Sequence, residues 1–558
     1  MKKLLITLLF ISNIAIAQTL EWANSNGAAD SDFASSVAID TNNNTFVIGS
    51  YRGTVDFDPG AGIFNLQSNG ENDIYIQKLD PQGNLIWARS LGGISREYGK
   101  EISTDSDGNI IVLGSFSDTI DADPGSGVTM LSSAGESDIL VLKLNSDGNF
   151  LWAKRIGTIK DDVGYALVHD SMDNSYITGR YEEYLGPPIP GNTTENSTFI
   201  SKIFVAKITS SGNTEWFQTI GGPGFDYGSD IDLDGDNFVY VNGRFQETLD
   251  FDAGPGVEVR TSNGGSDSYL LKLDTDGNFI WVKTFGGTLR DYATSIAVDT
   301  AGNILTLGLF EDTIDLDPSS GIFSLNSNGY DDFYIQKLDS DGNFIWGKSI
   351  GGPSDDIAYD LELDTENNLY VTGYFYETTD FNPNASTFEL NAMGMNDIFL
   401  LSLSPSGDFI DAESIGGPGF DSGYKVLIDD FNHIILAGSF YDTVDFNPGN
   451  GTFNMSSNGL GDAFVIKLNE RILGLNEFPS DLTFTVYPNP TNGLLTIALP
   501  QIEDQIGIQL YNMLGQQIRN YHVEQSREFD LEITGASGVY LLEVITNSSK
   551  KTLRIIKN

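Results

Sequence analysis

Pairs of oxygen-bearing side chains recur along the chain at a spacing that suits a hard cation. The pattern Thr-x-Asp-x-Asp/Asn occurs six times, and its paired members are Asp56 and Asp58, Asp121 and Asp123, Asp250 and Asp252, Asp315 and Asp317, Asp380 and Asn382, and Asp445 and Asn447. Residues two apart on an extended segment point to the same side, so each pair presents its oxygens together. Ca²⁺ prefers such ligands, and the pairs predict calcium sites. The alternative is that these side chains cap the backbone of Pro-Gly turns.

Catalytic constellations are sparse by comparison. Cysteine is absent, which excludes disulfides, thiolate metal sites and a cysteine nucleophile. His169 and His433 fall near predicted turns and are interpreted as turn residues. No phosphate-binding loop or nucleophile elbow is found, and carboxylates are too evenly spread to single out an acid/base pair. No catalytic residue is therefore predicted.

A tryptophan repeat sets the frame that positions these pairs. The six tryptophans are Trp22, Trp87, Trp152, Trp216, Trp281 and Trp346, with spacings of 65, 65, 64, 65 and 65 residues. One further step reaches Asp411. Each lies in a segment such as LDSDGNFIWGKSIGG, Leu338 to Gly352, which reads as a strand, a tight turn and a strand. A period of this size is typical of a repeat architecture.

Each repeat predicts four short antiparallel strands. In one copy these are Ala293 to Asp299, Ile304 to Phe310, Phe333 to Leu338 and Phe344 to Ile350. Second-strand glycines occur seven times, at Gly49, Gly114, Gly179, Gly243, Gly308, Gly373 and Gly438. The first fourth strand, around Trp22, precedes any complete repeat, and the last repeat lacks one. The counts predict an all-β, seven-bladed β-propeller in which the N-terminal strand completes the last blade.

Antiparallel order predicts two different faces for such a ring. The first-to-second and third-to-fourth turns share one face and are short. The second-to-third excursions and the blade connections share the other face, and they are long and rich in carboxylates. This long-loop face is the predicted binding face.

Charge and targeting signals indicate an exported protein. The chain has 78 acidic and 30 basic residues, a net charge of −48, which argues against nucleic acid and anionic membranes as partners. Residues 1–17 have the basic start, apolar stretch and small-x-small end of a secretory signal peptide. No later segment is long and apolar enough to span a bilayer. A monomer is expected.

Two family resemblances follow from the residues. The hairpins Asp105 to Gly114 and Asp299 to Gly308, with the Asp-Gly-Asn-x-x-Trp turns, resemble the bacterial SBBP-type β-propeller repeat. After a linker at 472–481, the segments Tyr487-Pro488-Asn489-Pro490, Leu510 to Gly515 and Gly538-Val539-Tyr540 resemble the type A sorting domain of the Bacteroidetes type IX secretion system, over 482–558. That resemblance implies export by the type IX machinery, to the medium or the cell surface. Seven short strands predict an Ig-like β-sandwich there.

These features lead to an expected function and two alternatives. The expected function is a secreted or cell-surface binding module, spanning 18–471, for a glycan, peptide or matrix ligand. One alternative is a polysaccharide lyase or hydrolase with its site on the long-loop face. The other is a structural component of a surface layer.

Overall fold

The computed structural model describes residues 18–184, 199–235, 237–429, 431–449, 451–469, 485–512, 517–533, 538–545 and 550–557. Every regular element in these ranges is a β-strand, which confirms the all-β expectation. The predicted signal peptide, the linker and most of the excursion between the second and third strands of the third repeat (185–198) lie outside the described residues. The chain divides into two compact units, 1–470 and 471–558, and each is described by itself. No described helix is long and apolar enough to cross a membrane.

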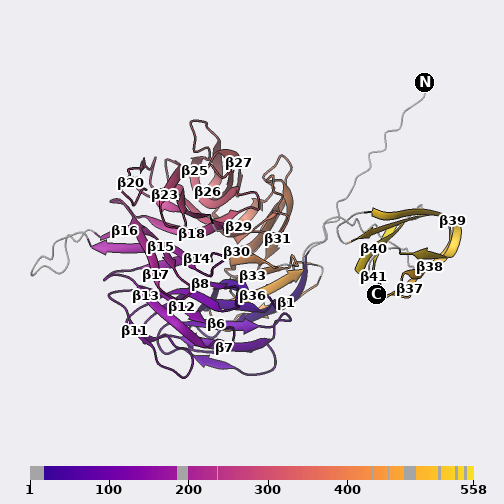
Figure 1. Cartoon of the computed structure of the whole chain (residues 1–558), viewed down its shortest axis with the longest axis horizontal. Coiled ribbons are helices and arrows are strands. Elements are labelled where there is room, and N and C mark those ends of the chain that lie inside the picture. The colour runs from indigo at the N-terminus through magenta and orange to yellow at the C-terminus, as the bar shows by residue number, and fades with distance from the viewer. Residues whose placement is uncertain are drawn as a thin grey trace, which may run out of the picture. The chain divides into compact units, whose positions relative to one another are not determined.

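The first unit repeats one four-stranded antiparallel sheet. Five such sheets are separate, and one eight-stranded sheet joins two more through contacts of β23 with β25. Figure 1 shows β8, β14 and β18 toward the middle of this unit and β7, β11 and β20 at its periphery. The first strands of the sheets are β2 (Phe33–Ile39), β8 (Glu97–Thr104), β14 (Val163–His169), β18 (Tyr227–Asp234), β24 (Asp291–Val298), β28 (Asp356–Leu363) and β32 (Ser422–Ile428). We call these the inner strands.

The other strands follow in order outward. The second strands are β3 (Thr45–Tyr51), β9 (Ile110–Phe116), β15 (Ser175–Tyr184), β19 (Phe238–Phe245), β25 (Ile304–Asp315), β29 (Leu369–Asp380) and β33 (Ile434–Phe440). The third strands are β6 (Asp73–Leu79), β12 (Asp138–Leu144), β16 (Phe199–Ile208), β22 (Asp267–Asp274), β26 (Ser324–Leu338), β30 (Glu389–Leu403) and β36 (Asp462–Asn469). The fourth strands are β7 (Leu85–Leu91), β13 (Phe150–Ile156), β17 (Thr214–Ile220), β23 (Phe279–Gly287), β27 (Phe344–Ile350), β31 (Phe409–Ile415) and β1 (Thr19–Asn26).

The excursions are more ordered than the sequence predicts. Four of them form short outer hairpins, β4 (Thr54–Asp56) with β5 (Asn65–Gln67), β10 (Thr119–Asp121) with β11 (Met130–Ser132), β20 (Thr248–Asp250) with β21 (Val259–Thr261), and β34 (Thr443–Asp445) with β35 (Asn454–Ser456). In two others the second and third strands simply continue, and Asp315 pairs with Ser324. The alternation of buried aliphatic and exposed polar residues in Thr54–Asp56 is a strand pattern that is only three residues long, too short to recognise in the sequence.

The N-terminal strand completes the sheet of the last repeat. β1 pairs antiparallel with β36, with Ala23 opposite Ile466. The same sheet packs on the first one, because Val37 and Val47 share a buried apolar cluster with Ile435 and Val465. Both faces of each sheet are therefore covered by neighbouring sheets, which explains why the second and third strands are apolar on both sides.

The tryptophans join neighbouring sheets. The indole N–H of Trp22 donates to the carbonyl of Pro81, and that of Trp87 donates to Ser146, in each case 59 residues further along the chain. The acceptor is the third-to-fourth turn of the next sheet. For Asp411 the same offset reaches residue 470, outside the described residues. The strand before it, β36, pairs with β1 from the start of the chain instead of with a following fourth strand.

The second unit is a five-stranded antiparallel sheet. Its strands are β37 (Thr485–Tyr487), β38 (Leu494–Asn512), β39 (Gln517–Glu532), β40 (Gly538–Ile545) and β41 (Lys550–Lys557). The expectation of seven short strands is corrected here. The expected pairs of short strands merge into β38 and β39 because the residues between them continue the ladder, as Glu503 and Ser526 show.

Candidate binding site

The predicted cation ligands are occupied by turn contacts. Asp56 Oδ1 accepts backbone N–H donors from Asp58 at 3.1 Å and Phe64 at 2.7 Å, and Asp58 accepts from Gly60 at 2.8 Å. The same contacts recur at Asp121, Asp123, Asp250, Asp252, Asp315, Asp317, Asp380, Asn382, Asp445 and Asn447. Within the described residues, no three His, Asp or Glu side chains gather in a way that could hold a metal ion.

Calcium binding by these excursions stays a prediction. If the pairs bind Ca²⁺, titrating calcium into the metal-stripped chain releases or absorbs heat and raises its melting temperature, because a ligand that binds only the folded state stabilises it. Chelator then reverses the shift. An unchanged melting curve together with a flat calorimetric trace would eliminate the sites.

The two histidines do not form a site. His169 Nδ1 lies 3.1 Å from Ser175 Oγ, and burial lowers the pKa of His169 to about 4. His433 Nδ1 lies 2.7 Å from Asp429 Oδ2, beside the Lys467 ammonium. Both lie where the first strand turns into the second, in the role that the sequence predicts for them.

Every inner strand carries a β-bulge near its start. The register against the second strand shifts between the residues that flank one extra residue. The extra residues are Ser35, Lys100, Tyr165, Ser229, Thr294, Tyr359 and Tyr424, and we call them the bulge ring. A bulge re-aims a side chain and is common beside functional sites. The residue before each bulge is Ala or Gly, because there is no room for more: a Cβ at Gly228 would lie 2.1 Å from Thr178 Oγ1.

The bulge ring side chains reach across to the next inner strand. Ser35 Oγ donates to the carbonyl of Gly99 at 2.8 Å, and Thr294 Oγ1 donates to that of Ala358 at 3.1 Å. Two of the larger members make an edge-to-face ring contact instead. The rings of Tyr359 and Tyr424 are 5.4 Å apart. Since the bulges lie near the strand starts, this ring faces the side of the blade connections, which is the long-loop face.

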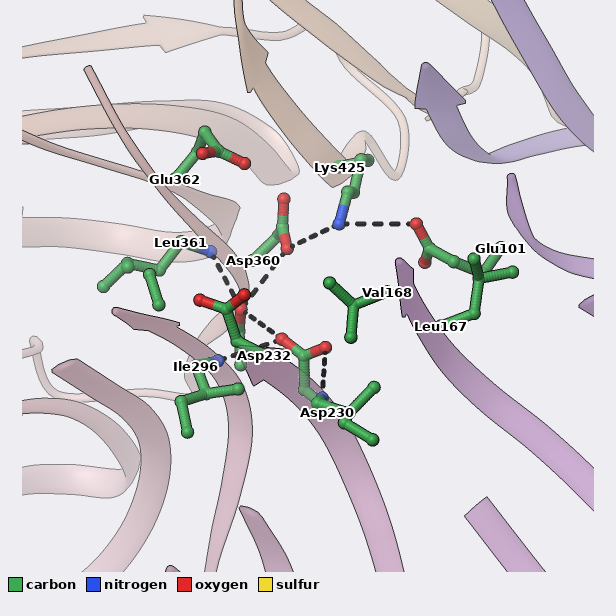
Figure 2. A pocket seen from close by; sticks show the side chains of 13 residues that line it. Glu101, Leu167, Val168, Asp230, Asp232, Ile296, Asp360, Leu361, Glu362 and Lys425 are labelled. Atoms are coloured by element: carbon green, nitrogen blue, oxygen red, sulfur yellow. Dashed lines mark hydrogen bonds and ion pairs between the residues drawn. The ribbon is translucent and has the colours of Figure 1, made fainter. Parts of the chain in front are cut away.

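Below the bulge ring the inner strands surround a cavity of about 160 Å³. Its lining includes Glu101, Asp230, Asp360, Glu362 and Lys425, from four different inner strands. Figure 2 shows the Lys425 ammonium between two carboxylates, 3.2 Å from Asp360 and 3.6 Å from Glu101. The cavity therefore holds one cation among several acids.

The acids of the cavity have a structural role. An inner strand has one free edge, and its backbone N–H groups there need acceptors. Asp230 Oδ2 accepts from the Ile296 N–H at 2.9 Å, and Asp232 Oδ2 accepts from the Val298 N–H at 2.7 Å. Asp360 Oδ2 accepts from the Val426 N–H at 2.9 Å. Each carboxylate thus ties its own strand to the next one around the cavity.

Burial gives these acids unusual proton affinities. It raises the pKa of Glu101 to about 7, that of Asp232 to about 7 and that of Glu362 to about 8, in spite of the nearby Lys425. Burial opposes the charged form of Lys425, but the charges of Asp360 and Glu101 outweigh it and raise the lysine pKa well above its ordinary range. A second set of buried acids at the inner-strand starts behaves in the same way, and burial raises the pKa of Asp291 to about 8.

The protein is expected to be more stable at pH 5.5 than at pH 8.5. The acids whose folded pKa is raised have unfolded pKa values near 4, so the folded chain binds more protons between about pH 4 and pH 8. Their stabilisation is complete below the unfolded pKa and is lost as the pH rises through 7 to 8. Acids with lowered pKa, such as Asp105 and Asp429, lose their contribution only at lower pH. Urea midpoints that are flat or rise toward pH 8.5 would contradict this.

The comparisons with known proteins agree with this division of the chain. Residues 485–558 match the family described as "Secretion system C-terminal sorting domain". The C-terminal unit is a secretion sorting domain. It supports secretion to the cell surface or the extracellular space.

The first unit is similar to larger proteins. The chain is 24% identical to an uncharacterized WD repeat-containing protein of Acanthamoeba polyphaga mimivirus, over 75% of the chain and 36% of the relative. It is 27% identical to the regulatory protein FlaEY of Caulobacter vibrioides, over 39% of the chain and 22% of the relative. The chain thus spans about a third or less of the length of these relatives. The first similarity favours a propeller fold.

Proposed function

We propose that the chain is a secreted or cell-surface binding module, a seven-bladed β-propeller of the SBBP type that the N-terminal strand closes. The ligand is an extracellular glycan, peptide or matrix component, held over the bulge ring on the long-loop face. The observation that carries this proposal is that seven equivalent bulges present a mixture of serine, threonine, lysine and tyrosine side chains around one cavity. A purely structural repeat has no need for that variety.

A glycan array probed with the purified full chain tests the binding function. We expect a small group of related glycans to bind. Replacing Tyr359 by serine is expected to weaken this binding, because Tyr359 is 36% exposed and a ligand can contact its ring. Tyr330, 68% exposed outside the bulge ring, provides the matched control. If the array, and an equivalent peptide array, give no signal, the binding function is wrong.

A polysaccharide lyase or hydrolase is the second candidate. The cavity favours it through acids with pKa values of 7 to 8 beside tyrosines, which is the range that general acid/base catalysis uses. The carboxylates of Asp230, Asp232 and Asp360 accept hydrogen bonds from backbone N–H groups of the next inner strand, and these bonds favour a structural role for the acids instead. Turnover of a polysaccharide by the chain, lost in Glu101→Gln, would establish the enzyme.

We propose type IX export through residues 482–558, with the signal peptide at 1–17 for the first membrane. Deleting 482–558 is expected to retain the propeller in the periplasm, where it stays folded because the two units are separately compact. Cell fractionation measures the distribution, with the full chain as control. Surface display of the truncated chain at the level of the full chain would refute the sorting role.

A further inference from the structure

We propose that Lys100, Arg180 and Arg244 form a subsite for the carboxylate groups of an acidic glycan, on the part of the bulge ring that the second, third and fourth repeats supply. The inference rests on the proposed binding function and names its ligand class. It comes from three side chains that the repeat does not require, of which only Arg180 has an ion-pair partner among the described residues.

The cations are dispensable for the repeat. Arg180 and Arg244 directly follow the second-strand glycine, and the equivalent residues in the other repeats are Ser50, Ser115, Leu309, Tyr374 and Ser439. Lys100 is a bulge residue, and its equivalents include Ser35, Ser229 and Thr294. Seven copies of one sheet form with or without these charges, so the fold does not explain them.

The charges are also poorly matched within the described part of the chain. Lys100 and Arg244 have no ion-pair partner there, and Arg180 has Glu182, with Nη1 3.5 Å from its Oε1. The Nε atoms of Arg180 and Arg244 are buried without a hydrogen-bond partner among the described residues. An unpaired buried donor is costly, and a ligand acceptor would remove that cost. In a chain with 78 acidic residues, cations left this free are conspicuous.

Arg180 and Arg244 converge on one aromatic cluster, and the Lys100 ammonium lies over the Tyr98 ring. The guanidinium carbons of Arg180 and Arg244 lie 5.5 Å and 5.1 Å from the centre of the Phe225 ring. Arg244 also lies 4.9 Å from the Tyr227 ring, which is 5.7 Å from the Tyr165 ring. Burial lowers the pKa of Lys100, and the charge of Arg180 lowers it further, so these two cations are close enough to repel. A bound anion would relieve that repulsion.

Two of the nearby carboxylates, Asp226 and Glu101, are engaged elsewhere. Asp226 accepts N–H donors from Gly222 at 3.0 Å and Gln246 at 2.8 Å, and Arg244 only partly offsets its burial. Glu101 points into the cavity toward Lys425. Lys100 and Arg244 therefore remain available to a ligand, while Arg180 is shared with Glu182.

The surroundings favour a glycan over an acidic peptide. The bulge ring carries both hydroxyl side chains of serine and threonine and tyrosine rings, and Tyr359 is 5.8 Å from Tyr374 and 5.4 Å from Tyr424 on its far side. Aromatic faces carry partial negative charge and attract the C–H face of a pyranose. Guanidinium groups bind carboxylates by paired N–H bonds. Together these are the contacts that a chain of uronate sugars offers.

The test is a binding titration of the full chain with polygalacturonate, alginate and hyaluronan. Each is compared with its carboxyl-reduced form and with poly-L-glutamate. We expect at least one acidic polysaccharide to bind more tightly than its reduced form, and Arg244→Ser and Lys100→Ser each to weaken that binding by about tenfold or more. Arg260→Ser removes an equal charge from the outer hairpin β20–β21 and is expected to leave binding unchanged. The first repeat has serine at the equivalent positions, Ser50 for Arg244 and Ser35 for Lys100, so both substitutions are compatible with the fold. An unchanged melting curve verifies that the variants are folded.

The inference is overturned if no acidic polysaccharide binds more tightly than its reduced form, or if poly-L-glutamate binds as tightly and with the same sensitivity to Arg244→Ser. If the chain then binds neutral glycans, the acidic-glycan subsite is wrong but the proposed binding function is retained. An array with no glycan or peptide signal would remove both.

Discussion

Replacing Lys425 by methionine is expected to lower the free energy of unfolding by roughly 3–5 kcal/mol at pH 8. The side chains of Lys425, Glu101 and Asp360 are only 20%, 16% and 8% exposed, so the two carboxylates would be left as buried, uncompensated charges. The loss shrinks at pH 5.5, because Glu101 has a pKa of about 7 and then takes up a proton. Urea unfolding followed by tryptophan fluorescence measures it, and all six tryptophans lie in the first unit.

Two control variants make the Lys425 result specific. The triple variant Lys425→Met, Glu101→Gln, Asp360→Asn removes both buried charges and is expected to recover most of the stability. Lys348→Met removes a lysine whose ammonium contacts only the exposed Asn384 at 3.0 Å among the described residues, and little change is expected. A Lys425→Met protein as stable as the wild type at pH 8 would show that the cavity charges are solvated.

Deleting residues 19–26 is expected to have the second large effect, the loss of soluble, cooperatively folded protein. These residues form β1, and without them the edge of β36 and the side chains beneath it are exposed. An unpaired sheet edge promotes aggregation. Size-exclusion chromatography and the urea transition measure the outcome.

A circular permutant separates closure from simple truncation. In this variant residues 19–26 follow Asn469 through an Asp-Gly-Asn turn copied from another repeat. They can then pair with β36 as the next strand along the chain, as β1 does in the wild type. It is expected to fold as well as the wild type. A deletion variant that unfolds like the intact chain would contradict closure of the ring by β1.

Much of the fold could be predicted because the same sequence pattern occurs seven times, so that each copy confirms the strands expected in the others. The strands Ile304 to Phe310 and Phe344 to Ile350 were expected and begin where the structure places β25 and β27. The C-terminal unit was harder, since it occurs once. The polar residues between its short apolar runs pair across β38 and β39, and one copy cannot distinguish them from loops.

The candidate site could be predicted only in part. The long-loop face was expected to act through Asp56 and its equivalents; in the structure these side chains hold turns, and their binding of Ca²⁺ stays a prediction. The bulge ring was missed because the inner strands are only seven or eight residues long, so one extra residue in each is too small a change to recognise in the sequence pattern. A signal was available in the Ala or Gly that precedes each bulge and in the changes of residue type that follow it, such as Ser35, Lys100 and Tyr165.

Hydroxyl-radical footprinting of the full chain, with and without a ligand from the array, tests the location of the site most directly. Tyrosines react readily and report their own exposure. The account predicts ligand protection at Tyr165, Tyr359 and Tyr424, and unchanged reactivity at Tyr330 and at Phe64 in the first excursion. Protection confined to the excursions, with the bulge ring tyrosines unaffected, would contradict it.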